Sequence, residues 1–420
     1  MRVVLALPAL LLLVVAAGCD ILTPDAPLES TVLDGTIEGM TASQVRQHFA
    51  GDEEFGRVFS VAEGLGPIFI AASCEQCHAG DGKGHPVFNL QRFGRLLPST
   101  GFDPMVEFGG PQLQHRAIPG YPPEAIPAGA TGLASLTPPA VTGLGFLDAV
   151  EDQTLIDMAD PCDLDDDRIS GRLQLLDPTP VIDEAIALER LGSPNPLARG
   201  TLVDGRYIGR FGKKGLTVNL LHQTVGAYHQ DMGITSDLIA EDLFNPAAGS
   251  RAADDVADPE VTSAAVANVV FYLKTLRVPP RRNGDDPLVQ EGEIIFRQTG
   301  CASCHVPTLV TGASEIEVLD RKEFHPYTDL LLHDMGPELD DGYTEGAVAE
   351  TSEWRTAPLW GLGLAADFQG GEMFLLHDGR ARSIEEAVEY HGGEASGSRG
   401  AFLALTPNQR AAIMAFLESL

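Results

Sequence analysis

Apolar side chains return at helical spacing in two segments of the 420-residue chain. In the first, over residues 266–276, one face would be apolar, and the prolines that follow in residues 278–280 cannot continue a helix. The second lies at the end of the chain, where Thr406 is a suitable N-cap and Pro407 suits the first helical position. The two predicted buried stripes consist of Val266, Val269, Val270 and Leu273, and of Ala412, Ile413, Phe416, Leu417 and Leu420.

The N-terminal segment is apolar but shorter than the ~18 residues that a membrane span requires. Residues 3–15 are almost wholly apolar, and small residues lead from them to Cys19. This order is typical of a signal peptide, and the small residues before a cysteine look like a bacterial lipobox. We therefore expect residues 1–19 to direct export and Cys19 to carry lipid, although Ala16 stands where leucine is commoner and ordinary cleavage is the alternative. Residues 20–45 would be a tether, and the mature lipoprotein would face the periplasm, held at the membrane by this anchor alone.

Two pentapeptides of the form C-x-x-C-H are the most specific motifs in the chain. Residues 74–78 read CEQCH, and residues 301–305 read CASCH. In an exported protein this spacing indicates covalent attachment of c-type haem. Two thiols one turn apart can bond the two vinyl groups of one porphyrin, and the adjacent histidine can ligate the iron. We therefore predict two covalent haems, held by Cys74, Cys77, His78, Cys301, Cys304 and His305.

The surroundings of the two motifs indicate an internal repeat. An apolar run precedes each motif, and each half ends in one of the two predicted helices. A haem motif near the start and a packed helix at the end are the layout of a cytochrome c domain. We therefore predict a mainly α fold with two cytochrome c-like domains, residues 46–278 and 288–420, joined by a linker at 279–287. Loop-rich insertions, with many prolines and glycines between residues 96 and 145, would enlarge the first domain.

Charge and cysteine content narrow the range of partners. The chain has 60 acidic and 28 basic residues, a net charge of −32, which repels phosphate backbones and excludes nucleic acid as a partner. An acidic surface around a haem edge would favour a small basic cytochrome as electron donor. Of the six cysteines, four are assigned to haem and Cys19 to lipid, which leaves Cys162 alone. We expect Cys162 to be a buried small residue rather than a nucleophile.

The second half resembles a family of haem enzymes. Residues 354–359 read WRTAPL, residues 376–380 read LHDGR, and residues 383–388 read SIEEAV. These segments resemble the C-terminal domain of the bacterial dihaem cytochrome c peroxidases and of the related methylamine-utilisation dihaem enzymes. The resemblance covers roughly residues 60–420 and implies two cytochrome c-like domains.

Three further segments resemble a narrower branch, whose members are described as dihaem oxidoreductases or thiol oxidoreductases. The resemblance implies an enzyme that takes electrons from a donor protein at the second haem and reduces a small-molecule oxidant, hydrogen peroxide first of all, at the first. The alternatives are an electron-transfer cytochrome without substrate chemistry and an oxidase of a partner protein. Members often form oligomers. The segments are RFG at 210–212, DMGIT at 231–235 and HDMGP at 333–337.

The resemblance implies that the sixth ligand of each iron sets the function of that haem. In the peroxidases the ligand of the second haem is a methionine at a fixed distance after the F-H-D-G motif, and in the methylamine-utilisation enzymes it is a tyrosine. The matching position here is His391. We expect His391 to be this ligand, and Met335 and the adjacent Tyr390 are the alternative ligands. The other possibility is that His391 binds no iron and is a surface histidine in a glycine-rich turn.

At the first haem, the resemblance implies acid–base residues on the open face. In the peroxidases a glutamine, followed about ten residues later by a glutamate, lines this face. Residues 222–232 match that stretch, and Gln223 and Asp231 take the two positions. His222 and His229 are further candidates as acid–base groups or as a displaceable ligand, and at least one of them is expected to be an ordinary surface histidine.

The peroxidases also place a tryptophan between the haems, and the narrower branch has one after RFG. This chain has Lys213 at that position, and Trp354 and Trp360 are its only tryptophans. An electron relay between the haems would therefore be absent or supplied by other residues.

An acidic loop between the two motifs matches part of a calcium-binding pattern. Residues 163–171 read DLDDDRISG, with carboxylates at positions 1, 3 and 5 and a backbone carbonyl at position 7. Arg168 replaces the usual glycine at position 6, and Gln174 stands where a bidentate glutamate is usual. The loop would bind Ca²⁺ or be a solvated acidic turn. The candidate ligands are Asp163, Asp165, Asp167 and Ile169.

Overall fold

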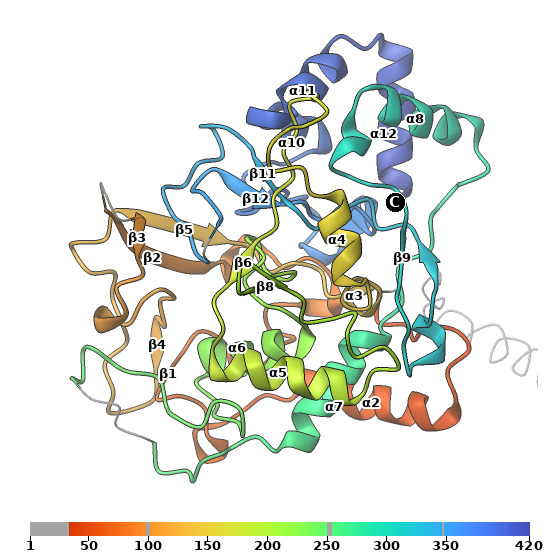
Figure 1. Cartoon of the computed structure of the whole chain (residues 1–420). Coiled ribbons are helices and arrows are strands. Elements are labelled where there is room, and N and C mark those ends of the chain that lie inside the picture. Colours follow the sequence, from red (N-terminus) through yellow and green to blue (C-terminus); the bar gives the residue numbers. More distant parts are fainter. Residues whose placement is uncertain (1–32, 98–100, 250–253, 347) are drawn as a thin grey trace, which may run out of the picture. The chain divides into compact units, whose positions relative to one another are not determined.

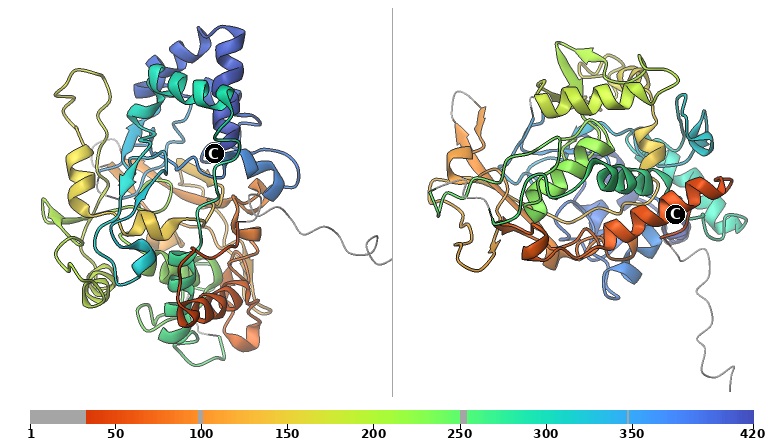
Figure 2. Two further views of the ribbon diagram at one scale, coloured as in Figure 1. Left: turned by 90° about the vertical axis from the view of Figure 1, so that its right-hand side faces the viewer. Right: turned by 90° about the horizontal axis from the view of Figure 1, so that it is seen from below.

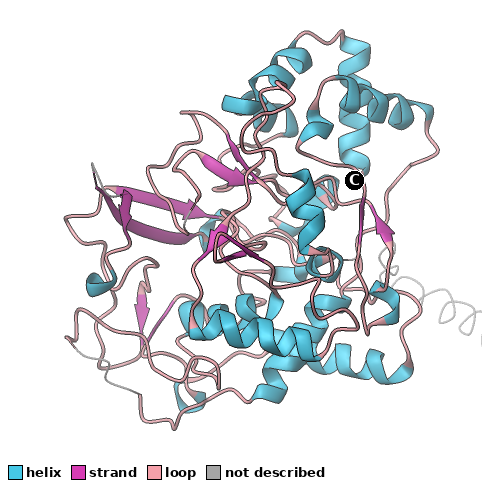
Figure 3. Cartoon of the chain, viewed as in Figure 1, coloured by secondary structure: helices cyan, strands magenta, loops and turns pink. Residues whose placement is uncertain are grey.

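A computed structural model describes residues 33–97, 101–249, 254–346 and 348–420 (Figure 1). Short helices and strands alternate with long loops in this part of the chain (Figure 3). The predicted signal peptide and Cys19 lie outside the described residues. Within the described ranges, each helix is too short or too polar to cross a lipid bilayer.

The longer helices begin where a polar side chain caps the first turn. The side chains of Thr41, Thr179 and Thr262, for example, each accept a backbone N–H of the helix that follows. In chain order the α-helices are α2 (Ala42–Gly56), α3 (Leu144–Asp148), α4 (Asp152–Met158), α5 (Pro180–Leu191), α6 (Leu220–Met232), α7 (Ser263–Thr275), α8 (Pro287–Gln298), α9 (Ala365–Phe368), α10 (Ile384–Glu389), α11 (Ser396–Leu403) and α12 (Pro407–Ser419).

Both helices that the apolar pattern predicts are present. α7 ends at Thr275, ahead of the prolines. α12 begins at Pro407 behind the Thr406 cap, and Gln409 completes a capping box. Their stripes face the interior, with Val266, Val269, Leu273, Ala412, Ile413, Phe416, Leu417 and Leu420 all buried.

Two helix pairs close the two halves of the chain in the same way (Figure 2). α2 packs against α7, and α8 packs against α12. A glycine lies at each crossing: a Cβ at Gly51 would collide with the carbonyl oxygen of Asn268, and one at Gly292 with that of Ala412. The two backbones approach so closely that only glycine fits. We call α2 with α7 the first clasp, and α8 with α12 the second clasp.

The strands are short and form small antiparallel sheets. Two sheets have three strands, in the orders β3-β2-β5 and β6-β8-β7, and the pairs β1-β4, β9-β10 and β11-β12 form two-stranded sheets. The strands are β1 (Ile68–Phe69), β2 (Leu90–Leu97), β3 (Gly101–Asp103), β4 (Arg116–Ala117), β5 (Gly132–Leu136), β6 (Leu175–Leu176), β7 (Leu202–Val203), β8 (Arg206–Ile208), β9 (Leu309–Val310), β10 (Glu323–Phe324), β11 (Leu332–Asp334) and β12 (Glu353–Arg355).

The prediction of a mainly α fold is wrong. The structure is 35% helix and 12% strand, so helices do not dominate it. The insertion expected to be loop-rich folds in part into the β3-β2-β5 sheet, in which Phe93 of β2 is fully buried opposite Leu133 of β5. Backbone groups of an insertion that packs on a core need partners, and antiparallel pairing supplies them.

The hydrophobic core follows the two halves only in part. One cluster of buried residues lies entirely within residues 289–420, around the second clasp. The other surrounds the first clasp but also includes Leu309, Phe324 and Trp360 from the second half. The two halves therefore share one of their cores, and the division at 279–287 stays a prediction.

The predicted tether and the predicted linker both make backbone contacts with the folded chain. Thr36 pairs with Leu276, and α2 begins at Ala42, inside the stretch that was assigned to the tether. The predicted linker is non-helical up to Pro287, where α8 begins, and Arg282 in it donates its backbone N–H to Ser419.

Candidate functional site

The first C-x-x-C-H motif forms a tight turn that holds its histidine in one orientation. The backbone N–H groups of Cys77 and His78 both donate to the carbonyl of Cys74, at 3.1 Å. His78 Nδ1 lies 2.8 Å from the carbonyl oxygen of Pro139. A carbonyl only accepts, so Nδ1 carries the proton and Nε2 keeps its lone pair. Burial lowers the pKa of His78 to about 4, which keeps the ring neutral at physiological pH.

The second motif repeats this geometry. A short 3₁₀ turn, Cys301–Ser303, brings the His305 N–H within 3.0 Å of the Cys301 carbonyl. His305 Nδ1 donates to the carbonyl of Tyr327 at 2.9 Å. Burial lowers the pKa of His305 to about 4, so this ring too is neutral. Each motif thus presents one neutral imidazole with its Nδ1 bonded to a backbone carbonyl.

The residues of both motifs fit a covalently attached haem. Cys74 and Cys77 are not joined in a disulfide although they share one turn, and neither are Cys301 and Cys304. A carbonyl partner on Nδ1 is the arrangement that fixes the tautomer of a metal-ligating histidine. Cys74, Cys77 and His78 would hold one haem, and Cys301, Cys304 and His305 the other. A bound haem would supply one-electron transfer and, where its distal face is open, reaction with a small oxidant.

His391 lies beside the second motif. It follows α10, and its Nδ1 donates to the Ala387 carbonyl at 2.7 Å, which leaves the lone pair on Nε2. A positive charge on His391 would act on His305, so the two rings lie within electrostatic range of each other. Burial lowers the pKa of His391. These are the properties of a neutral ligand, and the assignment of His391 stays a prediction.

The two alternative ligands of the second haem have other contacts. Met335 packs with Trp354 in a small apolar cluster that also includes Tyr390. The guanidinium of Arg380 lies over the Tyr390 ring, 5.7 Å from its centroid. Tyr390 therefore contacts Arg380 and the Trp354 cluster, whereas the adjacent His391 bonds to the Ala387 carbonyl.

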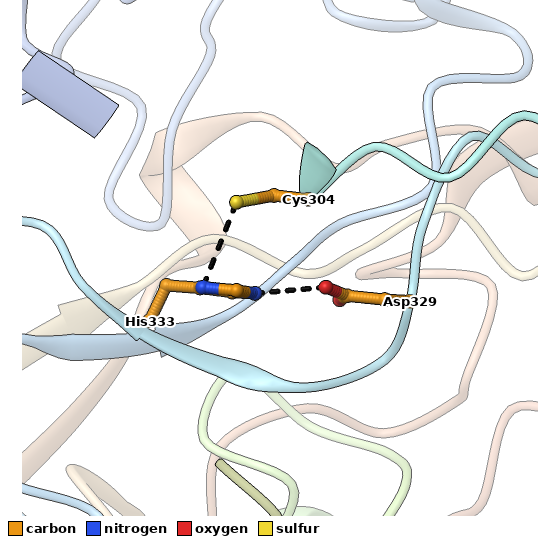
Figure 4. A group of neighbouring side chains, drawn as sticks. All are labelled: Cys304, Asp329 and His333. Carbon is orange, nitrogen blue, oxygen red and sulfur yellow. Dashed lines mark hydrogen bonds and ion pairs between the residues drawn. The ribbon is translucent and has the colours of Figure 1, made fainter. Parts of the chain in front are cut away.

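A buried histidine network touches the second motif (Figure 4). His333 Nε2 lies 2.8 Å from Asp329, and its Nδ1 lies 3.5 Å from the Cys304 sulfur. The same Nδ1 lies 2.8 Å from Glu394, which the figure does not draw. Carboxylates accept, so both ring nitrogens donate. Burial disfavours charge on His333, but its hydrogen bonds, above all that to Asp329, hold its pKa well above the usual value. Sequence reasoning noted His333 only within the HDMGP segment, because Glu394 and Cys304 are far from it in the chain.

Glu394 also joins the two halves of the chain. Its carboxylate accepts the Ser170 hydroxyl at 2.6 Å and the Ser170 N–H at 3.2 Å. Ser170 ends the acidic loop, whereas Glu394 lies three residues after His391. The acidic loop is thereby tied to the surroundings of the second haem motif.

Asp231 lies beside the first motif, near the end of α6. Its backbone carbonyl accepts the N–H groups of Ile70 and Ala71, at 2.7 and 3.0 Å, which holds the segment that leads into Cys74. Its carboxylate acts electrostatically on the thiols of Cys74 and Cys77. Burial raises the pKa of Asp231 to about 6, so the group can exchange a proton near neutral pH. The predicted acid–base residue is therefore placed next to the first haem motif.

The other residues predicted near the first haem, Gln223, His229 and His222, have different surroundings from one another. Gln223 accepts the hydroxyl of Thr217 at 3.0 Å. His229 donates from Nε2 to the carbonyl of Glu241 at 2.9 Å, so its imidazole is engaged by a loop. Burial lowers the pKa of His222 to about 4. Asp231 is thus linked to the motif by its hydrogen bonds and its charge, and the roles of the other residues stay predictions.

Gln112 is a residue of this site that sequence reasoning missed. It lies in the first-half insertion, is 1% exposed, and donates from Nε2 to Asp231 Oδ1 at 2.6 Å. Its approach to Asp231 joins positions more than a hundred residues apart. A local sequence pattern carries no signal for such a contact.

Aromatic and cationic side chains meet where the branch would have its tryptophan. Trp354 stacks on His377, with ring centroids 3.6 Å apart and planes at 10°. The Lys214 ammonium lies 3.9 Å from the Trp354 ring centroid. Burial and, to a smaller extent, the charge of Arg355 lower the pKa of Lys213 to about 8. Lys213 also acts on His78, so it lies near the first motif as expected for that position.

The acidic loop brings its three carboxylates together. Ligand atoms of Asp163, Asp165 and Asp167 lie within 4.8 Å of one another. All three carboxylates accept backbone N–H groups of the loop: Asp163 from Arg168 at 3.0 Å, Asp165 from Asp167 at 3.3 Å, and Asp167 from Ile169 at 2.8 Å. Calcium binding stays a prediction.

Two neighbours of the acidic loop differ from what the sequence led us to expect. Gln174 points away from the loop, because its amide donates to the carbonyls of Lys214 and Glu345, both at 2.9 Å. Cys162 is exposed, so the expectation that it is buried is wrong. It directly precedes the loop.

One family of known proteins matches most of this chain. The family described as "Di-haem oxidoreductase, putative peroxidase" matches residues 132–420, which include the second motif, Asp231 and the acidic loop. No curated protein matches the chain. Among solved structures, the hydrazine synthase of Kuenenia stuttgartiensis is 12% identical, covers 95% of both chains and has a TM-score of 0.37. A MauG-like protein associated with microbial copper homeostasis is 16% identical over 67% of this chain and 89% of its own, with a TM-score of 0.29.

The family match covers well over half of the chain and confirms the resemblance seen in the motifs. The protein therefore belongs to the di-haem oxidoreductases and is a dihaem redox enzyme.

Proposed function

We propose that this enzyme is a peroxidase: it takes electrons from a donor protein at the second haem site and reduces hydrogen peroxide at the first. Each peroxide would consume two electrons and two protons and release two molecules of water. The proposal covers the covalent c-type attachment of both haems through the two C-x-x-C-H motifs.

The observation that carries the proposal is the position and protonation of Asp231. Cleavage of an O–O bond needs a group that moves protons between the two oxygens. Asp231 lies partly buried beside Cys74 and Cys77, and desolvation raises its pKa to about 6. A carboxyl with this pKa can give and take a proton at the pH of a bacterial periplasm.

Features of the second motif support electron entry on that side. His305 and His391 both present neutral rings with Nδ1 on a carbonyl, which suits an iron held by two protein ligands. Such a site would transfer electrons and exclude substrate. The donor we propose is a small basic cytochrome, because the chain has a net charge of −32.

Spectroscopy of the haem-loaded protein tests the reaction. Electron paramagnetic resonance of the oxidised and half-reduced forms should show a high-spin, five-coordinate iron in at least one state, and peroxide should change that signal. If both irons stay low-spin and peroxide changes nothing, the protein is an electron-transfer cytochrome and the proposal fails.

Substitution of Asp231 tests the proton donor. Asp231→Asn should lower kcat/KM for peroxide by about 10²-fold or more, because a general acid–base group contributes at least that factor. Asp204→Asn is the matched control, since Asp204 is exposed in the β7–β8 turn. Equal losses in the two variants would contradict the role of Asp231.

The ligand and the anchor have separate tests. His391→Ala should alter the low-spin signal of one haem only, and an unchanged spectrum would exclude His391 as ligand. We also propose export and lipid attachment at Cys19. Radiolabelled palmitate should enter the wild-type protein in a bacterial host but not the Cys19→Ala variant, and labelling of both would refute the anchor.

A further inference from the structure

The Gln112 side chain can adopt only one of its two amide orientations. Arg92 donates from one guanidinium nitrogen to Gln112 Oε1 at 2.9 Å and from another to Glu345. A guanidinium has no acceptor, so the amide atom that faces it must be oxygen. The backbones of Arg92 and Gln112 are also bridged, which fixes the distance between the two side chains. The amide nitrogen of Gln112 therefore points the other way, toward α6.

Both hydrogens of that amide nitrogen are used at the end of α6. Gln112 Nε2 lies 2.6 Å from Asp231 Oδ1 and 3.0 Å from the Gln230 carbonyl oxygen. The carbonyl contact fixes the plane of the amide, and the carboxylate contact then fixes one oxygen of Asp231. Because Gln112 is 1% exposed, water does not compete for these bonds.

Few charged or titratable groups act on the Asp231 carboxyl. Burial favours its neutral form, whereas the Gln112 amide and the charge of Arg92 favour its ionised form. The thiols of Cys74 and Cys77 are the groups on which Asp231 itself acts. In the haem-loaded protein those sulfurs are thioethers and do not titrate, so Gln112 and Arg92 are the stabilising partners that remain.

We propose that Gln112 is the positioning residue for Asp231: it aims the carboxyl at the first haem site and stabilises its ionised form. Arg92, paired with Glu345 from the second half, keeps the amide in the donating orientation. The catalytic meaning of this inference rests on the proposed peroxidase function, but the arrangement itself can be tested without substrate.

The chain offers a matched control two residues away. Gln114 is also 1% exposed, lies in the same segment, and donates from Nε2 to the same Gln230 carbonyl at 3.0 Å. No contact of Gln114 with Asp231 is made in the described part of the chain. Gln114→Leu therefore removes a buried amide and its carbonyl bond but leaves the partner of Asp231 in place.

The test is a pH titration of the Asp231 carboxyl in the haem-loaded protein. Infrared difference spectra report the C=O band of a protonated carboxyl, and the band missing from Asp231→Asn identifies the signal. In wild-type protein we expect a midpoint above the ordinary value for an aspartate, because the carboxyl is desolvated. Gln112→Leu should raise the titration midpoint of Asp231 by about 1 pH unit or more, because a hydrogen bond to its charged form is lost. Gln114→Leu should leave it unchanged.

Gln112→Glu separates positioning from packing. The new side chain has the same size and still accepts from Arg92, but it faces Asp231 with an oxygen instead of an N–H. The two carboxyls would then share one proton, so the protonated band should persist to higher pH than in wild type. A wild-type midpoint in Gln112→Glu, or equal shifts in Gln112→Leu and Gln114→Leu, would overturn the proposal. Absence of peroxide turnover in the wild type would refute the peroxidase function but leave these midpoints to decide the role of Gln112.

Discussion

Adding one methyl group at the crossing of the second clasp should destabilise the protein. In Gly292→Ala the new Cβ would meet the carbonyl oxygen and carbon of Ala412 and the Cβ of Phe416. Backbone atoms cannot turn away as a side-chain end can, so α8 and α12 must move apart along their shared core. Overpacking of this kind costs about 1 to 3 kcal/mol. Gly51→Ala should have a similar cost at the first clasp, where the carbonyl of Asn268 stands in the way.

Urea unfolding of the haem-loaded variants, followed by far-ultraviolet circular dichroism, measures this cost. The control is Gly400→Ala in α11, where a Cβ would meet nothing within 4 Å. That change removes a helix-interior glycine and should stabilise the protein by up to about 1 kcal/mol. If Gly292→Ala unfolds at the wild-type midpoint or above it, the helices are not in the close contact that the structure gives them.

Two further predictions concern buried charges. Asp81 is buried and accepts the Tyr272 hydroxyl at 2.9 and 2.8 Å, and burial raises its pKa to about 7. The folded state therefore keeps a proton that the unfolded state loses above about pH 4, so stability falls as pH rises from about 4 to 7. Asparagine suits the positive φ of this residue. Asp81→Asn should therefore be more stable to unfolding than wild type by about 1 to 3 kcal/mol at pH 8, and the difference should close toward pH 4. A stability difference that does not change with pH would contradict this. Arg210 is fully buried, pairs with Asp152 and donates to the Val150 carbonyl at 2.6 Å. Arg210→Met should therefore lower the free energy of unfolding in urea by about 3 to 5 kcal/mol. A loss below about 1 kcal/mol would show that the pair is dispensable.

Local patterns predicted those features that depend on short stretches of sequence. The stripes of α7 and α12 and the cap at Thr406 need only neighbouring residues, and they are present as expected. The two C-x-x-C-H turns are equally local, because five residues define them.

The features that sequence reasoning missed depend on contacts across long separations. Gln112 reaches Asp231 through an insertion whose prolines and glycines gave no sign of the β3-β2-β5 sheet. His333 is hydrogen-bonded not only to the nearby Asp329 but also to Glu394, which is sixty-one residues away. Such partners emerge only when the chain is folded, since neither periodicity nor spacing encodes them.

The clasps also govern how the chain can vary in length. The segment between α2 and α7 is about twice as long as that between α8 and α12. The entropy of closing a loop grows only with the logarithm of its length, so a doubling costs about 0.6 kcal/mol. The first clasp therefore closes almost as readily as the second although it encloses several additional sheets. Insertions or deletions between the clasp helices, away from the haem motifs, therefore change the free energy of unfolding little through loop closure.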